Sequence, residues 1–276
     1  MKNEKIANFK RFAILIISIL SLFIFSSCVI TSPMEDAGGA GDTLDYSALI
    51  NGVYEEGIIS ANFQVELSSF KLASFGEKVA EATSKGSGVI FSVDGLDKPL
   101  GLYTYYILTN NHVIYKNDEY TNFEYTVIDC YGESYEAKLE YSDPDFDLAV
   151  LSFKCREDYK VLEFALFNPK KSDVVISMGG PLGVINAVTV GKVVDYAKIT
   201  LSAETGVGSD MSNVQFEVIK HSAYVNGGSS GGVLLDEDYR ICGINYAAEL
   251  DDDGAFVHGY AVPLEKVVEF INMQNQ

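Results

Sequence analysis

The residues best suited to covalent chemistry lie in the segment Gly227-Gly228-Ser229-Ser230-Gly231-Gly232-Val233. Two small hydroxyl residues stand among four glycines, and an apolar strand pattern follows. Glycines let the backbone turn so that amide N–H groups point inward, which is what the stabilisation of a developing oxyanion requires. Alone, the segment also fits a Gly/Ser loop. With a base and an orienting acid, Ser230 is a candidate nucleophile.

A serine hydroxyl is a weak nucleophile and needs a base, and the chain has three histidines, His112, His221 and His258. His112 follows an apolar run at 105–108 and three polar residues, the arrangement of a side chain at the end of a strand. His221 and His258 are expected to be ordinary loop or strand residues. Taken alone, His112 also fits a buried structural histidine.

The orienting carboxylate is expected from Asp147, which opens an apolar run at 148–151. Asp143 and Asp145 flank Pro144 and suit the turn before it. Taken alone, Asp147 also fits a residue that caps this turn.

One alternative is an α/β-hydrolase, because residues 228–232 satisfy its G-x-S-x-G pattern. That pattern requires a helix after the serine, and an acid and a histidine further along the chain. Here a strand pattern follows, and only His258 lies downstream. The α/β-hydrolase fold is therefore disfavoured.

Together the three segments resemble the trypsin-like serine proteases, and in particular the HtrA/Deg branch, whose motifs are written TNHV, DxxxDLAVL and GNSGG. The corresponding residues here are 109–113, 143–151 and 228–232, in the order base, acid, nucleophile. Residues 86–90, 174–183 and 188–194 are similar to further segments of that branch, so the resemblance covers about 86–263.

The resemblance implies an all-β fold, a trypsin-like double antiparallel β-barrel with a short C-terminal helix, and no metal or organic cofactor. It implies a catalytic triad of His112, Asp147 and Ser230. It also implies an oxyanion hole from the amides of Gly228 and Ser230. Substrate contacts are expected from Tyr224, Val225, Ile244 and Asn245.

The implied function is a serine endopeptidase that hydrolyses peptide bonds in exported or misfolded proteins through an acyl-enzyme. Tyr224 stands six residues before Ser230, where an aspartate would select Lys or Arg, so small or medium apolar residues are expected instead. Gly180, Ser222, Gly227, Ser229 and Val233 differ from the usual residues of the branch. The main alternative is therefore an impaired enzyme acting as a protein-binding or chaperone-like surface lipoprotein. A hydrolase that is not a protease is the lesser one.

The strand patterns place one barrel at about 84–160 and a second at about 170–262, followed by a helix at 263–273. Together these make a protease domain at 84–276, with no PDZ domain. Residues 46–83 are expected to be an extension that packs on the protease, with short helices at 46–59 and 76–83 around an extended segment at 61–70. Ten strand runs are predicted: 88–93, 103–109, 125–130, 135–141, 148–153, 173–178, 188–195, 214–219, 232–235 and 241–246.

The N-terminus has the order of a secretory signal, with basic residues, an apolar run at 12–25 and then small residues before Cys28. Residues 1–27 are predicted to be a signal peptide, and the small residues resemble a bacterial lipobox with Cys28 as the lipid attachment site. An uncleaved or differently cleaved signal is the alternative. Residues 28–45 are expected to form a flexible tether, which makes the protein an extracytoplasmic, membrane-anchored lipoprotein.

The formal net charge of −19 disfavours a nucleic acid partner, because phosphate binding depends on clustered Lys and Arg. The expected partners are protein or peptide substrates and, through the lipid, the membrane. A homo-oligomer stays open, since trimers occur in the HtrA branch. Cys130, Cys155 and Cys242 are expected to be free thiols rather than a 130–155 disulfide, and the acidic turn at 251–253 a solvated hairpin rather than a calcium site.

Overall fold

The computed structural model describes residues 45–97, 100–180, 186–199, 201, 208 and 210–273. All of them belong to one compact unit of the chain, Ala37–Gln276. The predicted signal peptide 1–27, Cys28 and nearly all of the tether 28–45 lie outside the described residues. No described helix is long and apolar enough to cross a membrane.

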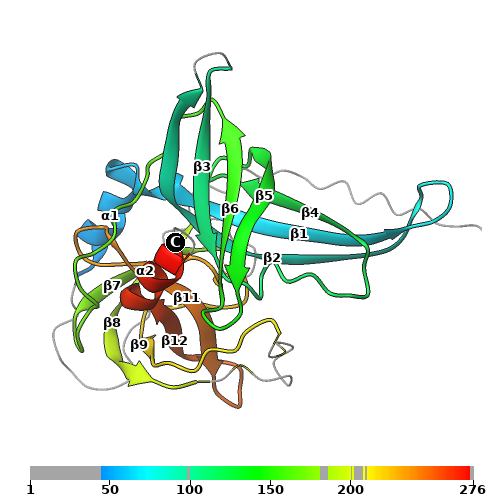
Figure 1. The fold of residues 1–276 in the computed structure, drawn as a ribbon. Coiled ribbons are helices and arrows are strands. Elements are labelled where there is room, and N and C mark those ends of the chain that lie inside the picture. Colours follow the sequence, from blue (N-terminus) through cyan, green and yellow to red (C-terminus); the bar gives the residue numbers. More distant parts are fainter. Residues whose placement is uncertain are drawn as a thin grey trace, which may run out of the picture. The chain divides into compact units, whose positions relative to one another are not determined.

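Six antiparallel strands close the first barrel in the order β1-β2-β3-β6-β5-β4 (Figure 1). Alternate residues of β1 such as Phe63, Val65 and Leu67 are buried, as expected for strands with one face toward a core. The strands are β1 (Asn62–Leu72), β2 (Lys78–Asp97), β3 (Leu102–Thr109), β4 (Asn122–Ile128), β5 (Ser134–Asp143) and β6 (Leu148–Cys155).

The second barrel is also closed, in the order β10-β11-β12-β9-β8-β7. Its strands are β7 (Val174–Gly179), β8 (Ala187–Ala197), β9 (Val218–His221), β10 (Val233–Leu235), β11 (Ile241–Leu250) and β12 (Phe256–Pro263). The predicted double-barrel fold is therefore confirmed, and each of the ten predicted strand runs overlaps an observed strand. The run predicted at 214–219 is a strand only from Val218.

The N-terminal boundary of the first barrel differs from the prediction of about 84. β1 and the first half of β2 belong to that barrel, so most of the predicted extension 46–83 is part of it. The predicted helix at 76–83 is wrong, because residues 78–83 lie in β2 and pair with 68–72 of β1. The two strands form a long hairpin that extends away from the rest of the barrel (Figure 1).

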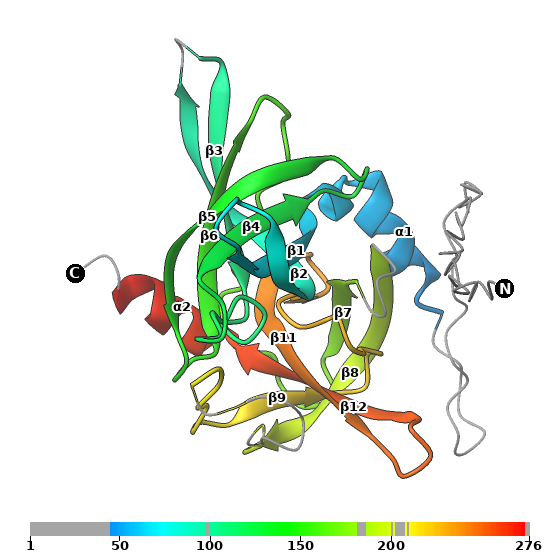
Figure 2. The same cartoon turned by 90° about the vertical axis from the view of Figure 1, so that its right-hand side faces the viewer.

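Short helices cover the barrels at both ends of the described chain. α1 (Ser47–Glu55) and the 3-10 turn η1 (Ile58–Ala61) precede β1, and the Tyr239 hydroxyl in the β10–β11 turn donates to the Leu49 carbonyl at 3.1 Å. α2 (Leu264–Met273) matches the predicted C-terminal helix and follows β12 directly. It lies beside β5 and β6 of the first barrel (Figure 2).

The buried Phe270 ring of α2 packs on Tyr141 and Phe146, with ring centroids 5.2 and 5.9 Å away. Phe146 immediately precedes Asp147. The last described helix, reached from the second barrel, thus supports the turn of the first barrel that carries the predicted acid.

The remaining structural predictions concern cysteines and metals. Cys130, Cys155 and Cys242 are free thiols, with the latter two buried. The Asp251 carboxylate accepts hydrogen bonds from the amides of Asp253 and Ala255, so it closes its own turn. Within the described residues no group of three or more His, Cys, Asp or Glu is arranged to hold a metal ion.

Candidate active site

The loop after β3 brings His112 to the junction of the barrels. Two buried asparagines anchor this loop: the Asn110 amide donates to the Asp147 carbonyl and the Asn111 amide to the Met211 carbonyl, both at 2.8 Å. These polar residues stand where the strand ends, so their side chains replace the hydrogen bonds that a strand partner would supply. The imidazole of His112 itself remains partly accessible, with 13% of its side chain exposed.

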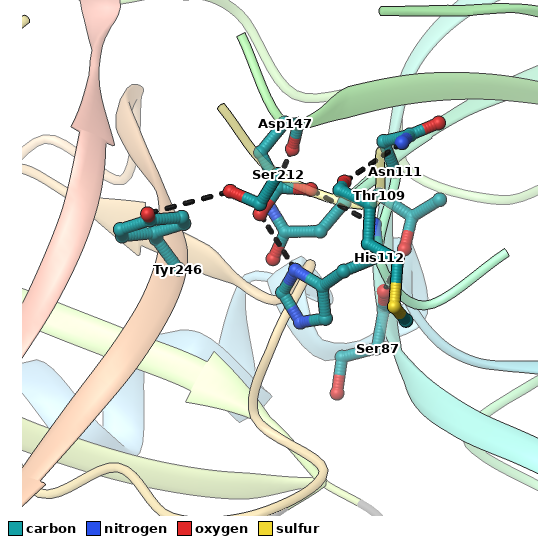
Figure 3. Close-up of polar contacts among 9 residues, drawn as sticks. Ser87, Thr109, Asn111, His112, Asp147, Ser212 and Tyr246 are labelled. Carbon is teal, nitrogen blue, oxygen red and sulfur yellow. Dashed lines mark hydrogen bonds and ion pairs between the residues drawn. The ribbon is translucent and has the colours of Figure 1, made fainter. Parts of the chain in front are cut away.

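Asp147 lies in the turn between β5 and β6 and is fully buried. Its φ of 49° is in the left-handed region, which aspartate tolerates better than most residues. One carboxylate oxygen accepts the His112 backbone N–H at 2.8 Å, and the other contacts His112 Nδ1 at 2.6 Å (Figure 3). A carboxylate can only accept, so Nδ1 carries a proton and Nε2 of the neutral ring is left as a base.

Ser212 and Tyr246 border this pair on the side of the second barrel (Figure 3). Both are buried, and the Ser212 hydroxyl donates to the Tyr246 hydroxyl at 3.4 Å. Burial raises the pKa of Tyr246 to about 12, and the nearby Asp147 charge acts in the same direction. Tyr246 is therefore a neutral phenol at neutral pH and adds no second negative charge beside Asp147.

The segment before Ser230 forms a tight turn. The Ser229 N–H donates to the Asn226 carbonyl at 2.8 Å, and of the two central residues only Gly228 has a positive φ, of 96°. Positive φ at the third position defines a type II turn and is best tolerated by glycine. The Ser229 hydroxyl accepts a hydrogen bond from the Asn226 N–H at 3.1 Å, which joins the first and last residues of the turn a second time.

The amide N–H groups of Gly228 and Ser230 meet no hydrogen-bond acceptor within the described part of the chain. The following residues are held firmly instead: the Gly231 N–H donates to the Asn245 carbonyl at 2.9 Å, and the Asn245 N–H to Gly232 at 2.7 Å. Two amides two residues apart are thus left available beside the Ser230 side chain, on a backbone anchored to β11.

Ser230 and His112 line one pocket of about 240 Å³. The base comes from the first barrel and the serine from the second, so the pocket exists only where the barrels meet. Its other lining residues are Leu201, Val225, Asn226, Gly227, Ser229, Asn245, Tyr246, Ala247, Ala248 and Leu250.

Residues 86–244 match the family model of the trypsin-like peptidase domain, which includes His112, Asp147 and Ser230. The chain belongs to the trypsin-like peptidase family. Its relatives are HtrA-type proteases, as the sequence motifs predicted.

One relative of this trypsin-like peptidase is "Serine protease Do-like HtrA" of Bacillus subtilis (strain 168), 32% identical over 84% of this chain and 48% of the relative. Another is "Periplasmic serine endoprotease DegP" of Escherichia coli (strain K12), 29% identical over 66% of this chain and 34% of the relative. The chain spans about half or less of the length of these curated relatives. A solved structure of a variant of the HtrA-type protease AlgW with a tripeptide has a TM-score of 0.59 and 25% identity, covering 83% of this chain and 63% of that one.

The residues predicted to contact substrate in this trypsin-like peptidase are only partly brought together. Val225 and Asn245 line the pocket. Tyr224 does not: its ring packs on Phe256 with centroids 5.0 Å apart, and its hydroxyl accepts from the Asn226 side-chain amide. Ile244 is fully buried in the core between β10 and β12.

Several residues of the trypsin-like peptidase site were missed by sequence reasoning. Ala247, Ala248 and Leu250 line the pocket because β11 continues four residues beyond the predicted run, and Tyr246, the last residue of that run, lines it as well. The small and apolar residues after Asn245 were the available signal. His221 and His258, expected to be ordinary residues, lie in β9 and β12 and do not line this pocket.

Proposed function

We propose that the chain is a serine endopeptidase in which Ser230 is the nucleophile, His112 the general base and Asp147 the orienting acid. Ser230 Oγ forms a bond to the carbonyl carbon of the peptide while its proton passes to His112 Nε2. The Asp147 carboxylate stays ionised and stabilises the imidazolium that results. The proton then passes to the leaving amine as the C–N bond breaks, which leaves an acyl-enzyme.

A water molecule then hydrolyses the acyl-enzyme by the same steps in the opposite direction. His112 takes a proton from the attacking water, the ester bond to Ser230 breaks, and the proton returns to Ser230 Oγ. In both steps the carbonyl oxygen becomes negatively charged, and the amides of Gly228 and Ser230 are the proposed donors to it. Apart from the substrate and this water, the chain's own residues supply every group that these steps use.

The contact of His112 Nδ1 with the buried Asp147 carboxylate, beside a pocket that Ser230 also lines, carries this proposal. The type II turn argues against the impaired-enzyme alternative. That alternative needs a collapsed oxyanion hole, whereas the Gly228 and Ser230 amides have no acceptor among the described residues.

The proposed substrates are exported or misfolded proteins with a small or medium apolar residue before the cleaved bond. Val225, Ala247 and Ala248 give the pocket an apolar wall, and among the described residues that line it only His112 is acidic or basic. Beyond Asn245, β11 pairs with β12 and with no second strand among the described residues. The other edge of residues 246–250 suits pairing with an extended substrate.

The proposed location is outside the cytoplasm, with a lipid on Cys28. The signal-like order of residues 1–27 supports this, as does the name of the DegP relative, a periplasmic endoprotease. Mass spectrometry of the mature N-terminus tests it: a diacylglycerol on Cys28 is expected, and an unmodified Cys28 contradicts the anchor without affecting the proposed chemistry.

Cleavage of unfolded casein by the full-length chain in mild detergent tests the activity. Ser230→Ala and His112→Ala should abolish cleavage, whereas His258→Ala is the matched histidine control and should retain it. Labelling of Ser230 by a fluorophosphonate tests the nucleophile separately. A wild-type chain that neither cleaves casein nor reacts with the fluorophosphonate would favour the protein-binding alternative.

A further inference from the structure

Ser87 lies on β2, where the first barrel meets the Ser230 segment of the second. It is almost completely buried. Its backbone N–H donates to the Ser230 carbonyl at 2.7 Å, and its hydroxyl donates to the Gly228 carbonyl at 2.8 Å. One residue of the first barrel therefore holds the carbonyls of both residues whose amides are the proposed oxyanion donors.

The remaining hydrogen bonds of Ser87 fix its own orientation. The Gly180 N–H at the end of β7 donates to the Ser87 hydroxyl at 2.8 Å. Because this amide can only donate, the hydroxyl hydrogen is directed at Gly228. The hydroxyl of Thr109, which stands three residues before His112, donates to the Ser87 carbonyl at 2.7 Å (Figure 3).

The contact with Gly228 matters because glycine has no side chain to restrict its backbone. A type II turn becomes a type I turn when its central peptide rotates and the third residue moves to negative φ. Here that rotation would turn the Gly228 N–H away from its present direction. Glycine makes this rotation at little steric cost. The Ser87 hydroxyl holds the other peptide of Gly228, the one that carries its carbonyl, and so fixes one end of the peptide that carries the Gly228 N–H.

We infer that Ser87 is a positioning residue for the proposed protease, an inference that rests on the proposed function. Its hydroxyl fixes the Gly228–Ser229 peptide and its backbone N–H fixes the Ser230 carbonyl, so that residues 228–230, which carry both proposed oxyanion donors, are held in place against the first barrel. Ser87 is not among the residues that line the pocket, so it acts through Gly228 and not on the substrate.

Ser87→Ala removes the hydroxyl and leaves the backbone N–H bond to Ser230 in place. Loss of a whole oxyanion donor costs roughly 10²- to 10³-fold in kcat, so loosening one donor should cost roughly 10- to 100-fold. KM should change little, because the pocket walls keep their residues. The cleavage sites in casein are first mapped by mass spectrometry of the wild-type digest, and the substrate is a chromogenic peptide with the sequence of one of them.

A peptide boronate separates positioning from a general loss of stability. It adds to Ser230 Oγ as a tetrahedral anion and places an oxygen where the oxyanion forms, whereas the product peptide of the same sequence does not. In Ser87→Ala the boronate inhibition constant should rise by the factor by which kcat falls, and that of the product peptide should stay unchanged.

Ser152→Ala is the matched control. Ser152 is a buried serine on β6 of the first barrel, its hydroxyl donates to Glu140 at 2.6 Å, and it does not line the pocket. It should leave kcat and both inhibition constants unchanged. If Ser87→Ala does not fold, Ser87→Cys gives the same comparison, because a thiol has nearly the same shape but is a poor donor.

Folded Ser87→Ala or Ser87→Cys with kcat and boronate inhibition near wild type overturns the inference and leaves the proposed function intact. Equal weakening of the boronate and the product peptide also overturns it, because that pattern indicates a damaged pocket. A wild-type chain that is inert toward casein and fluorophosphonate overturns both proposals.

Discussion

Replacement of His221 by leucine should make the folded chain less sensitive to acid. His221 lies in β9 between β8 and β12 and is fully buried, and neither ring nitrogen has a hydrogen-bond partner within the described residues. Burial lowers its pKa from the ordinary 6.5 to about 3; the nearby His258 lowers it further, and the Ala223 backbone opposes the shift without cancelling it. The imidazole is therefore held neutral in the folded state well below the pH at which it is protonated in the unfolded chain.

The sign and size of the effect follow from proton linkage. Between pH 6.5 and about 3 the unfolded chain binds a proton at His221 that the folded chain does not, so stability falls as the pH is lowered through this window. A pH of 5 lies about 1.5 units below the ordinary histidine pKa, which applies in the unfolded chain. Each unit corresponds to about 1.4 kcal/mol of free energy. His221 should therefore cost about 2 kcal/mol of unfolding free energy at pH 5 relative to pH 7.5.

Urea unfolding followed by far-UV circular dichroism at pH 7.5 and pH 5.0 measures this difference. The parent should carry Ser230→Ala so that it does not digest itself, and His221→Leu is made in that background. Between the two pH values the variant should lose about 2 kcal/mol less than the parent. At pH 7.5 the replacement should be well tolerated, since no hydrogen bond of the ring is broken.

His258→Leu is the matched control, because it removes a partly exposed imidazole from the neighbouring strand β12. It should change the pH dependence less than His221→Leu does. Equal losses in the parent and in His221→Leu between pH 7.5 and 5.0 would refute the reasoning, because they would mean that His221 is hydrated or protonated in the folded chain.

Three further predictions concern the site and its support. Asp147→Asn should lower kcat on the mapped peptide by about 10⁴-fold, because an amide can hold the imidazole in the wrong tautomer; a loss below tenfold would contradict the proposed role. Gly231→Ala should lower the unfolding free energy by at least about 2 kcal/mol, because φ is 83° and a side chain would collide with the β2 backbone; Gly95→Ala, which faces open space, should be nearly neutral in the same urea titration. Phe270→Ala should cost about 3 to 5 kcal/mol in that titration and reduce kcat as well, because the ring supports the turn that carries Asp147; a destabilised variant with wild-type kcat would show that the turn needs no such support.

The strands that sequence reasoning found are those with one face in a core. β6 begins with four apolar residues at 148–151 and the buried half of β11 is mostly apolar, which local pattern shows well. Residues 78–85 of β2 are mostly exposed and rich in Glu, Lys and Ala, which favours a helix locally; pairing with β1 overrides that preference. β12 was missed because His258 and Gly259 interrupt its pattern, and Gly259 is small because the His221 ring packs against it.

The three chemical residues were predictable because their chemistry demands particular side chains in a particular order. Ser87 was not, although its segment was recognised as similar to the HtrA branch. Its contact with Gly228 joins residues 141 positions apart, and no local pattern encodes such a pair. Tyr224, Val225, Ile244 and Asn245 were all expected at the pocket, and only Val225 and Asn245 line it. Alternate residues of a strand point to opposite faces, so within β11 Ile244 faces the core and Asn245 the pocket. Tyr224 lies outside the strands, and its ring packs on Phe256.

The packing of Phe270 on Phe146 has a consequence for biosynthesis. The proposed base and acid are made first, the nucleophile about 80 residues after the acid, and the ring that supports the acid's turn a further 40 residues later. A chain that is still being synthesised therefore contains each chemical group before it contains a supported site. Proteolytic activity should appear only after residue 270 has left the ribosome and docked.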